Sequence, residues 1–145
     1  MFYFEDVSLG ASVETPGWTL TETDVVRYAG LTGEWEPRTT DSEFSRRAEA
    51  GTRVVPDLLP LCLSIGLGWR VPHPPLAVLA FMGLEWNFSL PLRLGDTIRI
   101  RSRAVAKRAM RDGGVIVEEH EIVNQRDLVI QSGKLTFLVA KRPTK

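Results

Sequence analysis

Two acidic residues stand where a carboxylate could take part in proton transfer. Glu34 lies in the polar loop GLTGEWEPRTTD, and Asp57 directly precedes the apolar run LLPLCLSIGLGW. A carboxylate serves as a general acid or base near neutral pH when its surroundings keep it out of water. Asp57 also suits the N-cap of the helix that this run predicts, where its side chain would accept hydrogen bonds from first-turn N–H groups.

A row of arginines is the other group of residues with a chemical signature. Arg99, Arg101 and Arg103 alternate along one predicted strand and therefore project from one face of it. Such a row can bind phosphate groups or an acidic protein surface, and it can equally form a solvated outer face. Both interpretations remain open from the sequence.

The cysteine and the histidines favour structural roles. Cys62 lies in the apolar run and is predicted to be a buried small hydrophobe, while His73 stands between two prolines and His120 in an acidic strand segment. One cysteine and two separated histidines cannot form a familiar zinc site, so we expect no metal.

Composition narrows the class of protein. The 145 residues include 18 basic and 18 acidic side chains, and this net charge of zero provides no overall field for nucleic acid or an anionic membrane. The N-terminus does not resemble a secretory signal, and the longest apolar run is far shorter than the ~20 residues of a membrane span. We expect one domain over residues 1–145, soluble and cytoplasmic, with no nucleic-acid or membrane partner.

The first third of the chain predicts a strand and two helices. A short strand is expected at residues 12–19, followed by a helix that Thr21 caps and that Gly30 ends. A polar loop follows. Thr40 and Glu43 then have the spacing of a capping box and predict a second short helix.

The remainder predicts one core helix and four long strands. Residues 56–69 are apolar on nearly every side, which is typical of a helix surrounded by protein. With Asp57 as N-cap, Pro60 occupies the third helical position, where its missing N–H needs no partner. From Leu76 onward, runs rich in β-branched residues alternate with the turns LGD, RDGG and NQRD, which predicts antiparallel strands.

One apolar helix and one antiparallel sheet together predict an α+β hotdog fold, in which a long central helix is wrapped by a curved sheet. A single layer of this kind is thin and leaves apolar surface unburied. We therefore expect two copies, or two different hotdog subunits, to pair.

Three segments carry a resemblance that covers nearly the whole chain: FEDVSLGASVETPGWTLTETDVVRYAGLTGEWEP, AGTRVVPDLLPLCLSIGL and LPLRLGDTIRIRS. They resemble the MaoC-like hydratases and dehydratases, a hotdog family that includes (R)-specific enoyl-CoA hydratases. The resemblance implies a substrate that is an acyl thioester of coenzyme A or acyl carrier protein. It implies no separate cofactor, because coenzyme A or phosphopantetheine arrives as part of the substrate.

The family's first motif, of the form D-x-N-P-x-H, is altered here. Glu34 stands at its Asp position, Glu36 at its Asn position and Thr39 at its His position, while Pro37 is kept. The resemblance implies that the Asp and His together activate the water that adds to a 2-enoyl thioester. Thr39 can form hydrogen bonds but cannot exchange protons as imidazole does at pH 7.

The second motif, a His-Gly pair that opens the core helix, is replaced by Pro56-Asp57. In the family a backbone N–H at this helix start polarises the thioester carbonyl. Pro56 has no N–H, and the Asp57 carboxylate is expected to occupy the donors itself as the N-cap. Ordinary hydration of crotonyl-type thioesters should therefore be weak.

These observations favour a MaoC-like acyl-thioester hydratase or dehydratase with an altered site. Glu34 and Asp57 are its candidate catalytic residues. The candidate substrate-binding residues are Thr39, Trp35, Arg99, Arg101 and Arg103. Two alternatives remain open: a non-catalytic hotdog subunit that pairs with an active partner, and a repurposed thioesterase or cyclase in a polyketide or fatty-acid-like pathway.

Overall fold

A single antiparallel sheet with one helix against it forms the centre of the structure, a computed structural model that describes residues 1–49 and 51–143. Residues 50, 144 and 145 of the predicted domain lie outside the described residues. The strands are β1 (Ser12–Glu14), β2 (Trp18–Thr19), β3 (Val78–Phe88), β4 (Thr97–Ala109), β5 (Gly114–Val123) and β6 (Val129–Val139). The helices are α1 (Glu22–Thr32), α2 (Pro37–Thr40), α3 (Ser42–Arg47) and α4 (Leu58–Leu67), with 3₁₀ turns η1 (Phe4–Asp6) and η2 (Gly68–Arg70).

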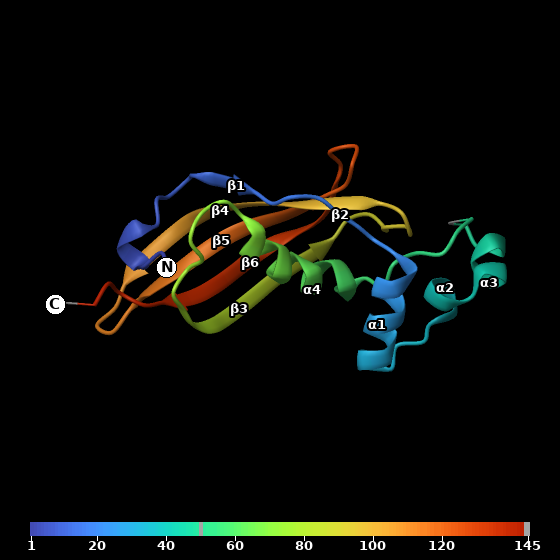
Figure 1. Ribbon diagram of the computed structural model, residues 1–145, viewed down its shortest axis with the longest axis horizontal. Coiled ribbons are helices and arrows are strands. Elements are labelled where there is room, and N and C mark those ends of the chain that lie inside the picture. The colour runs from blue at the N-terminus through green and yellow to red at the C-terminus, as the bar shows by residue number, and fades with distance from the viewer. Residues whose placement is uncertain (50, 144–145) are drawn as a thin grey trace.

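The strand order is β1-β4-β5-β6-β3, and β2 also pairs with β4. The four long strands predicted after Leu76 are thus confirmed as β3 to β6. The chain crosses over after β3, which pairs with β6 and forms one edge of the sheet. Helices α1, α2 and α3 gather beyond one end of the sheet, and the N-terminus and the end of β6 lie at the other end (Figure 1). This arrangement is the predicted α+β hotdog fold.

Helix α4 packs on the inner face of the sheet. Leu59 and Leu67 join a buried core with isoleucines from alternate positions of the strands, among them Ile98, Ile100 and Ile122. Alternate residues of a strand face opposite sides of a sheet, so these isoleucines define the face that α4 covers. The predicted start is confirmed, because Asp57 is the N-cap and Pro60 the third helical residue.

The predicted end of α1 is wrong by one turn. The helix continues through Gly30 to Thr32 and ends at Gly33, whose φ is +76° and whose N–H donates to the Ala29 carbonyl. A left-handed residue closes a helix in this way, and glycine adopts that conformation without steric cost. The capping box that opens α1, between Thr21 and Asp24, is present as expected for a Thr N-cap.

The loop and cap predicted before α3 also need correction. The loop contains a helix of its own, α2, which begins at Pro37. The N-cap of α3 is Asp41, whose carboxylate accepts hydrogen bonds from the N–H groups of Glu43 and Phe44. Thr40 cannot take that role, because it belongs to α2 and its hydroxyl donates to the Glu36 carbonyl.

The strand predicted at residues 12–19 is divided into β1 and β2. Pro16 interrupts it, since proline has no N–H to donate to the neighbouring strand. The Thr15 hydroxyl bridges the break, donating to the Pro16 carbonyl and accepting from the Ile100 N–H. The first strand therefore stays attached to β4 on both sides of the proline.

Much apolar surface of α4 and β3 stays uncovered in the single chain. Leu58 and Ile65 of α4 are 49% and 44% exposed, and Cys62 between them is exposed as well. The prediction that Cys62 is buried is thus wrong for one chain, because the sheet covers only one side of α4. Strand β3 adds the exposed side chains of Phe81 and Leu84. Apolar patches of this kind mark association surfaces.

We expect the chain to form a dimer in which this surface is covered. Leu84→Asp should shift the protein toward monomer, because the new carboxylate would be desolvated at the edge strand. Leu9→Asp, at an exposed site before β1 on the opposite edge, is the matched control. Sedimentation velocity at micromolar concentration measures both. A wild-type chain that is strictly monomeric, alone and with proteins of its host, would contradict the expectation.

Candidate active site

Glu34 follows directly on the left-handed residue that ends α1. This turn brings the Glu34 carboxylate back to the helix, where the hydroxyl of Tyr28 donates a hydrogen bond to its Oε2 at 2.9 Å. The Thr32 hydroxyl accepts from the Glu34 N–H at 3.2 Å and so fixes the backbone. The carboxylate is therefore held by a specific partner and does not move freely in a solvated loop.

Tyr28 is the site residue that sequence reasoning missed. Burial and the hydrogen bond to Glu34 raise the pKa of Tyr28 to about 12, and the nearby ionisable groups Glu34, Cys62 and Asp57 act in the same direction. The phenol thus stays protonated at neutral pH and serves as a hydrogen-bond donor. Because the charges of Glu34 and Asp57 both act on Tyr28, α1, the turn at Glu34 and the start of α4 lie close together. No motif marks Tyr28; only its position one and a half helical turns before Glu34 could have suggested it.

Thr39 is turned away from solvent. Its side chain lies in α2, the residue is 1% exposed, and its hydroxyl donates to the Glu36 carbonyl at 2.9 Å. Arg53 holds the same segment by donating from Nε to the Thr39 carbonyl at 2.9 Å, and its Nη2 pairs with Glu22 of α1. The residue at the family's His position thus helps to fix α2 against α1. Its predicted contact with substrate stays a prediction.

Glu36, at the family's Asn position, is paired with Arg38. The guanidinium contacts both carboxylate oxygens, with Nη2 to Oε2 at 3.0 Å. This pairing raises the pKa of Arg38. The hydrogen bond to Glu36 is the larger cause, and the negative charge of Glu36 is the next. Since Glu36 is committed to Arg38, Glu34 is the carboxylate of the loop that remains available for chemistry.

The start of α4 is anchored to the sheet by Gln131 of β6. Its Nε2 donates to the Asp57 carbonyl at 2.8 Å, while its Oε1 accepts from the Trp86 indole of β3 at 2.9 Å. Gln131 is buried, so both ends of its amide need these partners. The position of the helix start relative to the sheet follows from this bridge.

The N–H groups at the start of α4 are open, and the expectation that Asp57 occupies them is wrong. N-cap side chains bond the N–H groups of the second and third helical residues. Here the third is Pro60, which has no N–H, and the N–H of Leu59 donates to the Pro56 carbonyl. Asp57 has helical backbone angles and makes no side-chain cap bond. Within residues 1–49 and 51–143, nothing accepts from the N–H of Asp57 or Leu58.

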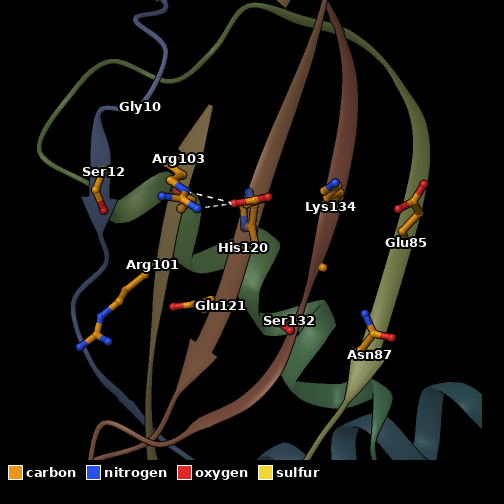
Figure 2. Close-up of a pocket in the computed structure, with 13 residues that line it drawn as sticks. Gly10, Ser12, Glu85, Asn87, Arg101, Arg103, His120, Glu121, Ser132 and Lys134 are labelled. Atoms are coloured by element: carbon orange, nitrogen blue, oxygen red, sulfur yellow. Dashed lines mark hydrogen bonds and ion pairs between the residues drawn. The ribbon is translucent and has the colours of Figure 1, made fainter. Parts of the chain in front are cut away.

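The predicted arginine row lies on the outer face of the sheet, away from α4. Figure 2 shows Arg101 and Arg103 at a shallow hollow of about 600 Å³ that also includes the side chains of β5, β6 and β3. Arg103 pairs with Glu119 at 2.7 Å, and Arg99 and Arg101 both pair with Glu14 and Asp127. Each arginine thus already has an acidic partner, and phosphate binding by the row stays a prediction.

The other predicted residues lie apart from the Glu34 site or at its rim. Trp35 is 59% exposed beside Glu34, and its place in an acyl pocket stays a prediction. His73 stacks on Phe2. Over the described ranges, no cluster of His, Cys, Asp and Glu has the arrangement of a metal site, and no helix there is long and apolar enough to cross a membrane.

Residues 6–125 match the family described as MaoC like domain. The chain belongs to this family. The MaoC-like chain is 31% identical over 102 residues to a protein from Methylorubrum extorquens named 3-hydroxybutyryl-CoA dehydratase, and 28% identical over 99 residues to an (R)-specific enoyl-CoA hydratase from Rhodospirillum rubrum. These segments cover 70% and 68% of the chain but only 62% and 66% of the two relatives.

Solved structures agree with the hotdog arrangement. A protein of Archaeoglobus described as a monoamine oxidase regulatory protein superposes with a TM-score of 0.90 at 29% identity, over 98% of this MaoC-like chain and 96% of that one. A MaoC-like dehydratase of Rhodospirillum rubrum gives 0.87 at 20% identity, over 99% and 100% of the two chains. The resemblance seen in the sequence is thereby confirmed.

The Tyr28–Glu34 contact predicts an unusual tyrosine titration. The Tyr28 phenol should ionise near pH 12, and Glu34→Gln should lower this pKa by removing the adjacent charge. Because the folded-state pKa is raised above the unfolded value of ~10, the contribution of Tyr28 to stability is complete below pH ~10 and lost as pH rises toward 12. The phenolate absorbance of wild type minus that of Tyr28→Phe isolates this group. An ordinary pKa near 10 would contradict the contact.

Proposed function

We propose that this MaoC-like chain is an acyl-thioester hydratase or dehydratase in which Glu34 carries the proton transfer. The observation that carries the proposal is the hydrogen bond from the buried Tyr28 hydroxyl to the Glu34 carboxylate, close to the open N-terminus of α4. The names of the two curated relatives, a dehydratase and a hydratase of coenzyme A thioesters, support the same class of reaction.

The thioester carbonyl binds at the start of α4 in this proposal. The N–H groups of Asp57 and Leu58 lack an acceptor within the described part of the chain, and the helix dipole adds partial positive charge there. As water adds to a 2-enoyl thioester, negative charge develops on the carbonyl oxygen, and donors already in place stabilise it. The Asp57 carboxylate lies at the same helix end and opposes this charge, which suits a slower enzyme than one with glycine there.

Glu34 then acts first as base and afterwards as acid. Its carboxylate takes a proton from water while the water oxygen bonds to C3 of the enoyl group, and the C2–C3 π electrons move toward the thioester. The protonated Glu34 returns that proton to C2, which restores the thioester carbonyl. Dehydration is the reverse sequence. One carboxylate can therefore perform both proton transfers, for which the family uses an Asp and a His.

Tyr28 is a positioning residue in this scheme. Its hydroxyl donates to one oxygen of Glu34 and leaves the other free to face substrate, and its raised pKa keeps the proton on the phenol. The substrate class that we propose is an acyl thioester of coenzyme A or of an acyl carrier protein. Its pantetheine arm accompanies the acyl group, so no separate cofactor is invoked.

A second candidate function is a non-catalytic subunit that completes a hotdog pair. The position of Thr39 favours it, because the hydroxyl that replaces imidazole is buried and bonded to the protein's own backbone. The exposed apolar side of α4 and the exposed edge strand β3 fit a partner of either kind, a second copy or a different hotdog subunit.

Glu34→Gln decides between these functions. If the chain performs its own chemistry, this variant should lose at least 100-fold in turnover of 2-enoyl thioesters. Tyr28→Phe should lose about 10- to 150-fold, because a hydrogen bond to a charged group contributes about 1.5–3 kcal/mol. Turnover of coenzyme A and acyl-carrier thioesters of several chain lengths is followed by the absorbance of the enoyl group.

Glu43→Gln is the matched control, since Glu43 is an exposed carboxylate of α3 that pairs with Arg46. It should retain full turnover, and thermal melts should show all three variants folded. Wild-type turnover that survives in Glu34→Gln would remove Glu34 from the mechanism. Activity that appears only with a second hotdog protein and ignores Glu34→Gln would establish the subunit function instead.

A further inference from the structure

A buried glutamine lies on the core face of the sheet beside the start of α4. Gln131 of β6 is 3% exposed, and its register neighbours are Ile122 of β5 and Phe88 of β3. Ile122 belongs to the apolar core that α4 covers. Packing alone favours an aliphatic side chain at such a position, so the reason for an amide here lies in its hydrogen-bond partners.

The indole of Trp86 fixes which end of this amide faces the helix. Its N–H donates to Gln131 Oε1 at 2.9 Å, and Gln131 Nε2 donates to the Asp57 carbonyl at 2.8 Å. An indole nitrogen is a donor and never an acceptor, so it selects the oxygen of the amide. Gln131 therefore presents an N–H group, and not an oxygen, to the start of α4.

The Asp57 carbonyl and the Leu58 N–H belong to one peptide group. That group is planar and trans, so its N–H points in the direction opposite to its carbonyl. Gln131 holds the carbonyl oxygen from the side of the sheet, while the Leu58 N–H has no acceptor within the described part of the chain. The hydrogen bond from Gln131 thus acts on the same peptide group that presents the open donor.

Polarisation passes through this peptide group. A donor on a carbonyl oxygen draws electron density from the amide nitrogen, and hydrogen bonds in series strengthen one another in this way. Trp86 donates to Gln131, and Gln131 donates to the Asp57 carbonyl. The Leu58 N–H continues the same series of donors. It is therefore a stronger donor than a peptide N–H without this support.

From this geometry we infer that Gln131 is a positioning residue for the thioester carbonyl, because it orients and polarises the Leu58 N–H that stabilises the developing negative charge. Trp86 takes part by fixing the orientation of the Gln131 amide. The inference rests on the proposed function, in which the Leu58 N–H is one of the donors to the thioester carbonyl. It adds that the strength of this donor is set from within the sheet, across one peptide group.

Gln131→Met tests the hydrogen bond in the full chain without ligand, since it removes the amide and keeps a side chain of similar length. The carbonyl ¹³C resonance of Asp57 and the ¹⁵N resonance of Leu58 should both move upfield, because the bond acts on both ends of the peptide group. Gln125→Met is the matched control. Gln125 is an exposed glutamine of the β5–β6 turn with hydrogen bonds of its own, and its loss should leave both resonances unchanged.

Butyryl-coenzyme A with ¹³C at its carbonyl carbon is an unreactive probe of the donor, because its saturated acyl chain cannot be hydrated. Bound to wild type, its carbonyl stretch should lie at a lower frequency than in water, since oriented donors polarise the C=O bond. Gln131→Met should move the stretch back toward its value in water, and Trp86→Phe should do so to a smaller extent. Gln125→Met should leave it at the wild-type position.

Gln131→Glu separates hydrogen bonding from packing. A protonated glutamic acid can donate to the Asp57 carbonyl and accept from Trp86, whereas a carboxylate has no proton to donate. The lowered stretch of the bound probe should therefore be present when the new carboxyl is protonated and absent when it is ionised, a state that its own infrared bands report. The same pH series in wild type is the control, because Glu34 and Asp57 are also ionisable.

Turnover gives the functional readout. Gln131→Met should lower kcat for 2-enoyl thioesters about tenfold, less than the ~100-fold or more that follows from removing an oxyanion donor outright. KM should stay within about twofold of wild type, because the stronger donor acts mainly in the transition state. A merely structural role would raise KM as well, since the carbonyl site itself would be displaced.

Two results separate failure of this inference from failure of the proposed function. If wild type lowers the carbonyl stretch of the probe and Gln131→Met lowers it equally, Gln131 has no part in setting the donor. If the stretch in wild type equals its value in water, the proposed placement of the carbonyl at α4 is wrong and this inference falls with it. Should Gln131→Met not fold, a wild-type stretch in both Trp86→Phe and ionised Gln131→Glu is the result that overturns the inference.

Discussion

The hydrogen-bonded bridge through Gln131 sets the geometry on which the rest of the site depends. One buried amide joins β6 to the Asp57 carbonyl at 2.8 Å and to the Trp86 indole of β3 at 2.9 Å. Leaving either end unpaired would cost about 1–3 kcal/mol, so α4 has one favourable starting position on the sheet. Pro60 reinforces that start because it needs no N–H partner in the first turn. At that start the N–H groups of Asp57 and Leu58 have no acceptor within the described part of the chain.

Strong local signals made much of the fold predictable. The apolar run with Pro60 defined α4, and the alternating β-branched runs after Leu76 defined four strands. Predictions failed where two candidates of similar local propensity compete. Gly30 and Gly33 both suit a helix end, and only the left-handed turn at Gly33 brings the chain back to Tyr28. The crossover that places β3 beside β6 depends on contacts distant in sequence, which no local pattern encodes.

The site was predictable in its motif positions but not in its contacts. Glu34 could be identified from its place in the loop, whereas Tyr28 could not, because their hydrogen bond forms only after α1 and the Gly33 turn are both in place. The start of α4 shows the opposite case. An Asp at an N-cap normally accepts first-turn hydrogen bonds, yet Asp57 does not, because Pro60 and the Pro56 carbonyl leave it no donor. The residue type of Asp57 alone therefore predicted a cap hydrogen bond that its neighbours Pro56 and Pro60 prevent.

The central claim is that Glu34 and the start of α4 act on the same thioester. A crystal structure of the chain with an unreactive analogue of a 2-enoyl pantetheine thioester tests it most directly. The account predicts the analogue's carbonyl oxygen at ~3 Å from the N–H of Leu58, with the Glu34 carboxylate facing C3 across one water molecule and Tyr28 still bonded to Glu34. An analogue bound with its carbonyl away from α4, or with Glu34 on the opposite side from C3, would contradict it.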